Sequence, residues 1–134
     1  MLAGSFTPTG PDLVALHRAS NALSFLDGDG AGGFTASLLT TGFDPFAISA
    51  GDFNGDGHLD LLVNENRERT LAVLAGAGDG TFSRTVVGFV EPIGPALVTD
   101  LDLNGMPDVT VLQTDLDQVV VLLNCHPALG QPCP

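Results

Sequence analysis

The sequence predicts an all-β fold built from repeated units of about 48 residues. A nine-residue pattern at Asp52–Asp60 recurs at Asp100–Asp108, with oxygen-bearing side chains at the first, third, fifth and ninth places and glycine at the sixth. The same shift of 48 positions carries Leu26 to Leu74 and then to Leu122 without an insertion. The chain also contains 17 Gly and 9 Pro, which suits short strands joined by tight turns. A fixed period of this length is typical of a β-propeller or a solenoid.

The strands are placed most clearly in the middle unit, where short apolar and β-branched runs without helical spacing favour extended structure. Asp-Gly turns separate the third and fourth strands, at Gly76–Gly80 here and at Asp27–Gly30 one unit earlier. The third strands, including Val119–Leu122, are apolar on both faces, so we expect both faces to be covered, as in stacked blades. The four predicted strands are Phe46–Ala50, Leu61–Asn64, Thr70–Ala75 and Phe82–Val87.

Two acidic loops carry the residues expected to bind calcium, a cation that prefers roughly 6–8 oxygen ligands. The first acidic loop, Asp52–Asp60, offers four side chains and one backbone carbonyl, and the second acidic loop, Asp100–Asp108, offers a matching set. In the corresponding stretch Gly4–Asp12 only Asp12 keeps a carboxylate, so we expect no metal there. The predicted ligands are Asp52, Asn54, Asp56, the carbonyl of His58 and Asp60, then Asp100, Asp102, Asn104, the carbonyl of Met106 and Asp108.

An EF-hand or dockerin loop is the main alternative for this pattern. Such a loop ends in an acidic ligand at its twelfth place and lies beside a helix. The first acidic loop has Val63 at that place, and both loops run directly into β-branched or apolar segments. The ninth-place aspartate therefore closes each loop, and a strand follows.

The segment DFNGDGHLDLLV, followed by LAVLAG and GDGTF, resembles the FG-GAP/VCBS repeats of integrin alpha-type β-propellers. The resemblance covers nearly the whole chain, and Gly32–Phe34 echoes the last of these motifs. It implies four-stranded blades with Ca²⁺ held between the first and second strands. On this basis we expect a partial blade 1 at 1–44, blade 2 at 45–92 and a partial blade 3 at 93–124.

About three blades fall short of the 4–8 that close a propeller ring. The ring is completed either by further sequence or by association of copies, and we expect a homo-oligomer, most simply a dimer. The exposed end faces are expected to include Leu23, Phe25, Val119 and Val121. The segment Ser5–Thr9 is expected to supply the strand that the last blade lacks, in another copy.

Charge and hydropathy exclude some classes of partner, and the calcium loops indicate a compartment. Against 16 acidic side chains stand only 4 Lys and Arg, a formal net charge of -12, so nucleic acid is not an expected partner. No apolar run approaches the roughly 20 residues that span a bilayer, and no signal segment is recognisable. Because calcium loops of modest affinity suit calcium-rich surroundings, we expect a secreted or extracellular protein, with the periplasm or cell surface as further options.

The tail at 125–134 is rich in proline and holds both cysteines. In an oxidising compartment Cys125 and Cys133 would form a local disulfide, and the alternative is a metal site that includes His126. The disulfide is favoured because two Cys and one His leave the usual four zinc ligands incomplete.

Two classes of function fit the sequence. The first is a non-catalytic module that recognises a protein or a glycan, as in adhesion proteins or lectins. The second is an accessory propeller segment of a secreted carbohydrate-active or other hydrolytic enzyme. No nucleophile or metalloprotease motif is present, and His17, His58 and His126 lack catalytic partners in the sequence, so we expect no enzyme activity. The absence of Trp and Tyr weakens a lectin interpretation.

Overall fold

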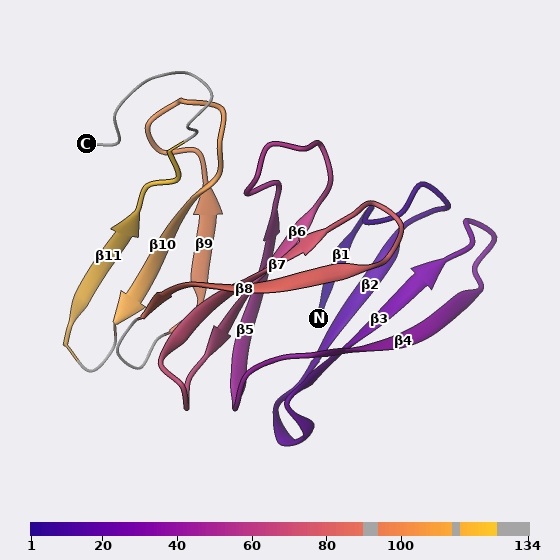
Figure 1. Cartoon of the computed structure of the whole chain (residues 1–134), viewed down its shortest axis with the longest axis horizontal. Helices are drawn as coiled ribbons and strands as arrows, with labels where there is room; N and C mark the ends of the chain where they lie inside the picture. The colour runs from indigo at the N-terminus through magenta and orange to yellow at the C-terminus, as the bar shows by residue number, and fades with distance from the viewer. Residues whose placement is uncertain (90–93, 114–115, 126–134) are drawn as a thin grey trace.

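A computed structural model describes residues 1–89, 94–113 and 116–125. Figure 1 shows three antiparallel sheets standing side by side in chain order, and we call them blades 1, 2 and 3. Blade 1 contains β1 (Leu2–Gly4), β2 (Asp12–His17), β3 (Ala22–Gly28) and β4 (Phe34–Thr40), with the 3-10 turn η1 (Arg18–Ser20). Blade 2 contains β5 (Pro45–Gly51), β6 (Asp60–Glu65), β7 (Thr70–Gly76) and β8 (Phe82–Phe89). Blade 3 contains β9 (Ala96–Thr99), β10 (Asp108–Gln113) and β11 (Gln118–Leu122).

Each blade is a meander in which consecutive strands pair as neighbours. The predicted all-β repeat is confirmed, and the four strands predicted for the middle unit coincide with β5 to β8 within two residues at each end. The described part of the chain forms no closed ring. The two Asp-Gly segments lie at hairpin turns, where the Asp29 and Asp79 carboxylates accept hydrogen bonds from the turn backbone.

Alternation of side chains along the strands gives each blade two apolar faces. We call the face toward the preceding blade the leading face and the face toward the following blade the trailing face. Between blades 1 and 2, Val14, Leu23 and Phe25 on the trailing face pack against Leu61 and Val63 on the leading face. Between blades 2 and 3, the matching trailing residues Leu62 and Leu71 meet the leading residues Val109 and Val111. The two interfaces are therefore built from corresponding positions of the repeat.

Three aromatic rings complete the interface between blades 1 and 2. Phe25 and Phe82 have ring centroids 5.4 Å apart, and Phe6 lies 6.0 Å from each of them. Rings at this separation prefer tilted or edge-to-face arrangements, which is the geometry found here. Phe6 comes from the loop before β2, Phe25 from β3 and Phe82 from β8, so the cluster joins two blades.

The first unit departs from the 48-residue period in its first strand. Gly4 pairs with Asp12, whereas Gly51 pairs with Asp60, so the loop before β2 is one residue shorter than the first acidic loop. The residue that corresponds to Phe6 is therefore Phe53. Each donates its backbone N–H to the aspartate that closes its loop.

Two expectations for the ends of the stack were wrong. Leu23 and Phe25 are only 0% and 2% exposed, because they face blade 2 rather than the outside. The segment Ser5–Thr9 does not serve as a spare strand, because Phe6 is buried in the core of its own chain. Val119 and Val121 are 62% and 48% exposed, as expected for an outer face.

Among the described residues, no helix has the length and apolar character needed to cross a bilayer.

Candidate metal centre

The first acidic loop joins β5 to β6 and is shaped by its own carboxylates. The Asp52 carboxylate accepts hydrogen bonds from the backbone N–H groups of Gly55, Asp56 and Gly57, at 2.8 to 3.1 Å. Gly55 and Gly57 have φ angles of 74° and 87°, a left-handed backbone that favours glycine. The Asp56 carboxylate accepts the His58 N–H at 2.8 Å. The loop is thus folded around oxygen atoms, as a site for a hard cation requires.

The second acidic loop joins β9 to β10 with closely matching contacts. The Asp100 carboxylate accepts the N–H groups of Asn104 and Gly105, and Asn104 Oδ1 accepts the N–H of Met106. Asp102 accepts hydrogen bonds from both the backbone and the side chain of Asn104. Figure 1 shows both loops on the same edge of the stacked sheets.

The second acidic loop gathers three carboxylates into one group. Oxygen atoms of Asp100, Asp102 and Asp108 all lie within 4.8 Å of one another. In the part of the chain that the structure describes, the three carboxylates of the first acidic loop form no such group. The third place of that loop is Asn54 rather than an aspartate, and its amide donates to Asp56 Oδ2 at 2.8 Å. The residue pattern alone ranks the first acidic loop higher, because Leu103 and Pro107 depart from that pattern in the second.

The closing aspartate of each unit occupies a shared structural position. Asp12, Asp60 and Asp108 are all 0% exposed. One oxygen of each accepts an N–H from its own loop, and the other accepts the N–H of the residue 16 positions later, at or just after the end of the third strand. These later residues are Gly28, Gly76 and Asn124, and the sequence analysis did not identify them as part of the site. Their common spacing of 16 residues from the closing aspartates is the sequence signal that could have identified them.

Burial raises the pKa of Asp60 above its ordinary value, and the charges of Asp56 and Asp52 raise it further. Hydrogen bonds from the N–H groups of Gly76 and Phe53 act in the opposite direction but do not cancel the effect. At Asp56 the hydrogen bond from the His58 N–H lowers the pKa. The first acidic loop therefore combines an ionised, exposed carboxylate with a buried one that would gain from a nearby cation.

The loop before β2 places threonine hydroxyls, rather than further carboxylates, around its closing aspartate. Thr7 Oγ1 donates to Asp27 Oδ1 at 2.9 Å, Thr9 Oγ1 donates to the same oxygen at 3.0 Å, and Thr7 also contacts Asp12. Burial raises the pKa of Asp12, but the N–H groups of Gly28, Thr7 and Phe6 and the Thr7 hydroxyl together hold it below its ordinary value. Protein donors thus satisfy both carboxylates, and the absence of a metal in this loop stays a prediction.

The donor set of the acidic loops is chemically consistent with a hard divalent cation. Carboxylate, amide and carbonyl oxygens suit Ca²⁺, Mg²⁺ or Mn²⁺, whereas zinc sites rely on Cys and His.

The remaining predicted residues are placed as follows. Met106 is buried at 7% exposure and its backbone N–H bonds within the loop, and the His58 ring lies against Gly78. His17 hydrogen bonds to Ser24 Oγ at 2.7 Å. His126 and Cys133 lie outside the described residues, so the pairing of Cys133 with Cys125 stays a prediction.

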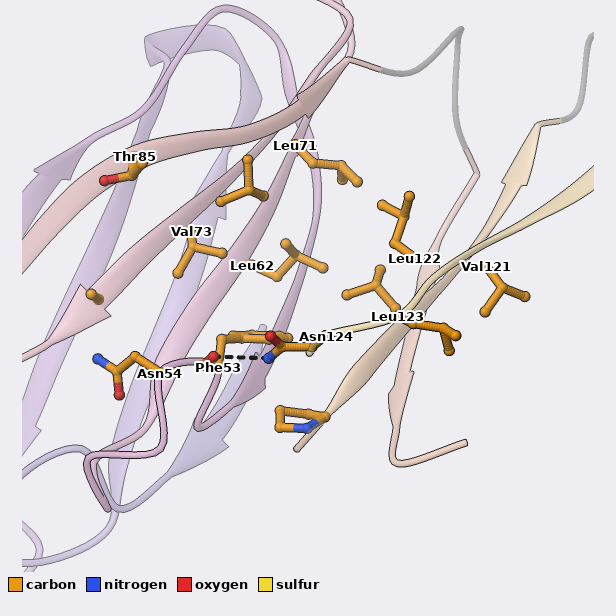
Figure 2. A pocket seen from close by; sticks show the side chains of 14 residues that line it. Phe53, Asn54, Leu62, Leu71, Val73, Thr85, Val121, Leu122, Leu123 and Asn124 are labelled. Atoms are coloured by element: carbon orange, nitrogen blue, oxygen red, sulfur yellow. Dashed lines mark hydrogen bonds between the residues drawn. The ribbon is translucent and has the colours of Figure 1, made fainter. Parts of the chain in front are cut away.

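An apolar pocket of about 690 Å³ lies between blades 2 and 3, next to both acidic loops. Figure 2 shows Leu62, Leu71 and Val73 on one side, Leu122 and Leu123 on the other, and Asn124 reaching to Phe53. The repeat explains the pocket. Val73 stands where blade 1 has the larger side chain of Phe25.

Stacked four- and three-stranded meanders with acidic loops between their first and second strands define a class of β-repeat proteins. A family model described as FG-GAP-like repeat matches residues 10–63 and 52–111. The chain therefore belongs to the FG-GAP-like repeat family. Comparisons with curated proteins and with solved structures gave no significant match.

Proposed function

We propose that this chain is a calcium-binding, non-catalytic propeller module that recognises a protein or a glycan in a secreted or extracellular setting. The observation that carries the proposal is the group of three carboxylates, Asp100, Asp102 and Asp108, in a loop of an FG-GAP-like repeat. Each carboxylate already accepts a backbone or side-chain hydrogen bond that fixes its orientation. A cation would add its charge to a preformed set of oxygens.

Calcium suits these loops better than magnesium does. Ca²⁺ accepts irregular sets of roughly 6–8 oxygens, whereas Mg²⁺ demands near-octahedral geometry and releases its water reluctantly. The second acidic loop offers the carboxylate oxygens of three aspartates, the Asn104 side chain and a backbone carbonyl. The first acidic loop offers fewer gathered carboxylates, so we expect it to be the weaker of the two sites.

The recognition role is supported by where the acidic loops lie. Both occupy one edge of the stack, and Leu101 and Leu103 of the second acidic loop are 48% and 87% exposed. Exposed loops held by a rigid scaffold commonly carry binding residues. The net charge of -12 opposes binding to nucleic acid or to an anionic membrane, which leaves proteins and glycans as the partners.

Calorimetric titration with CaCl₂ tests the metal step directly. We expect two equivalents for the unmodified chain, and one each for Asp102→Ala and Asp56→Ala, which remove a ligand oxygen. Asp117→Asn is the matched control, because it removes the same charge from an exposed turn outside both loops. At about 100 times its dissociation constant, calcium should stabilise the fold by about 2.7 kcal/mol per site in thermal melts.

The metal step fails if calcium gives no heat and melts with CaCl₂ and with EDTA coincide. If Asp117→Asn loses as much bound calcium as Asp102→Ala does, the effect comes from the overall charge of the chain and not from the loop. Glycan-array and protein pull-down experiments at saturating calcium, repeated with EDTA, then separate a glycan ligand from a protein ligand.

A further inference from the structure

Blade 1 and blade 3 each expose one apolar face, and each face corresponds to one that is buried elsewhere in the same chain. We propose that these faces bind each other between two copies of the chain, head to tail, with Phe34 of one copy packing against Leu101 and Val121 of the other. This inference does not depend on calcium binding.

The trailing face of blade 3 is the first half of the contact. Val109 and Val111 point into the interface with blade 2, so the alternate residues of β10 and their partners on β9 and β11 point outward. The outward residues are uncharged and well exposed, at 63%, 45%, 62% and 48% for Leu97, Leu112, Val119 and Val121. In blades 1 and 2 the corresponding trailing positions Leu23, Phe25, Leu71 and Val73 pack against the next blade.

The leading face of blade 1 is the second half. Leu23 and Phe25 face blade 2, so Ser24 and Leu26 face away, together with their β4 partners Leu38 and Ala36. Leu38 is 73% exposed. His17 is the one titratable side chain at the described strand positions of this face, and its ring hydrogen bonds to Ser24. Covering the face would therefore bury no unpaired carboxylate or ammonium group.

The aromatic cluster between blades 1 and 2 identifies the residues that would meet in this contact. Phe34 pairs with Gly28 as Phe82 pairs with Gly76, so the two phenylalanines occupy corresponding positions. Phe82 packs against Phe6 and Phe25 of the preceding blade, whereas Phe34 packs against no such pair among the described residues and is 49% exposed.

On blade 3 the positions of Phe6 and Phe25 are taken by Leu101 and Val121. Leu101 donates its N–H to Asp108 as Phe6 does to Asp12, and both Leu101 and Val121 are 48% exposed. A second copy placed by the same blade-to-blade step would bring its Phe34 onto this pair. Half-exposed residues on both sides would then form an apolar cluster at the positions that correspond to the cluster between blades 1 and 2.

A contact between two different faces is heterologous, so it closes into a ring only at a fixed number of copies. Two copies of three blades give six, which lies within the 4–8 blades that propellers use. We therefore expect a dimer of about 27.4 kDa, twice the chain mass of 13.7 kDa. Every copy would use both of its end faces.

Variants of the two faces test the contact by light scattering coupled to size exclusion. Leu38→Lys and Val119→Lys each place a charge on one exposed face, and Leu116→Lys, in the exposed turn between β10 and β11, is the matched control. We expect each face variant to be a folded monomer by circular dichroism and the control to remain a dimer. An equimolar mixture of the two face variants should recover the dimer mass, because one intact interface remains.

The mixture has no ring closure to strengthen it, so it is measured at about ten times the concentration. The unmodified chain could instead form a ring of more than two copies. If both face variants break that ring and their equimolar mixture stops at two copies, the same contact is supported with a different number of copies in the ring. An unmodified chain that is monomeric at micromolar concentration overturns the proposal. So does a dimer that survives either variant, or a mixture that stays monomeric. Calcium titration of the same samples shows whether the proposed metal function stands independently.

Discussion

Asn124 Nδ2 donates a hydrogen bond to the backbone carbonyl of Phe53 at 2.8 Å, across the interface between blades 2 and 3 (Figure 2). The backbone N–H of Asn124 binds Asp108 Oδ1 at 2.8 Å, and its carbonyl accepts Asn104 Nδ2 at 2.9 Å. One residue after β11 therefore holds the second acidic loop in place and ties it to the first. The corresponding residues Gly28 and Gly76 have no side chain with which to make such a link.

Replacing Asn124 with alanine should weaken the contact between blades 2 and 3. The substitution removes the bond to Phe53 but leaves both backbone contacts, so we expect a loss of about 1 kcal/mol in the free energy of unfolding. Urea denaturation measures this loss, with the exposed Gln118→Ala as control. Equal stability of the two variants would show that the Asn124 side chain contributes nothing to the interface.

Asp12 should stabilise the fold without binding calcium. Its carboxylate accepts N–H groups from Phe6, Thr7 and Gly28, and an amide in its place has only one accepting oxygen. We therefore expect Asp12→Asn to lower the free energy of unfolding by about 2 kcal/mol, the scale of hydrogen bonds to charged groups. The number of calcium equivalents in calorimetry should stay unchanged. A lost equivalent would instead assign a third metal site to blade 1.

The repeat and most strands could be predicted because Asp60 and Leu74 recur with their neighbours at fixed spacing. The register of β1 could not, because the ungapped 48-residue shift sets Gly4 opposite Asp52, whereas the one-residue deletion before Asp12 sets it opposite Gly51. The Thr7, Thr9 and Asp27 network was also missed. Thr7 and Thr9 follow Phe6 as Asn54 and Asp56 follow Phe53, and Asp27 stands where the next unit has Ala75, so the next unit has no parallel network that could reveal this one.

Which of the two acidic loops brings its carboxylates together could not be predicted from the sequence either. A pattern of residue types ranks the first acidic loop higher, because glycine follows Asn54 and precedes His58, and no proline interrupts it. Side-chain hydrogen bonding decides which oxygens face one another. The Asn54 amide binds Asp56 directly, and in the second acidic loop Asp102 stands in the place of Asn54 and joins Asp100 and Asp108.

Glu65 predicts a pH dependence of stability that is unrelated to metal. It is 0% exposed, bonded to Arg84 at 2.5 Å, to the Gly42 N–H at 2.7 Å and to the Thr70 hydroxyl at 2.7 Å. Burial raises its pKa, but the hydrogen bonds from Arg84, Gly42 and Thr70 outweigh this and leave the pKa below its ordinary value. Its contribution is therefore complete above the unfolded pKa of about 4.3 and is lost as the pH falls through the folded pKa.

We accordingly expect Glu65→Gln to unfold more easily than the unmodified chain at pH 7, by about 3 kcal/mol, because a buried charge pair is broken. The difference should shrink as the pH is lowered from about 5 to 3, where the native carboxylate becomes protonated. Glu68→Gln removes the same charge from a side chain that is 35% exposed and serves as the control. A difference that is constant over this range would mean that the charge of Glu65 does not stabilise the fold.

The pocket between blades 2 and 3 predicts a substitution that increases stability. Val73 occupies the position of Phe25, and the pocket beside it has a volume of about 690 Å³, with Phe53 at its wall where Phe6 lies in the first interface. In Val73→Phe the new ring would regain contact with Phe53 and bury further apolar area at about 25 cal/mol per Å², so we expect a gain of about 1 kcal/mol. Thermal and urea denaturation measure the gain.

Val86→Phe, on the same blade but outside the pocket, is the control. If Val73→Phe unfolds more easily than both the unmodified chain and the control, the space is filled in solution, because an extra ring in a packed interior costs about 1–3 kcal/mol.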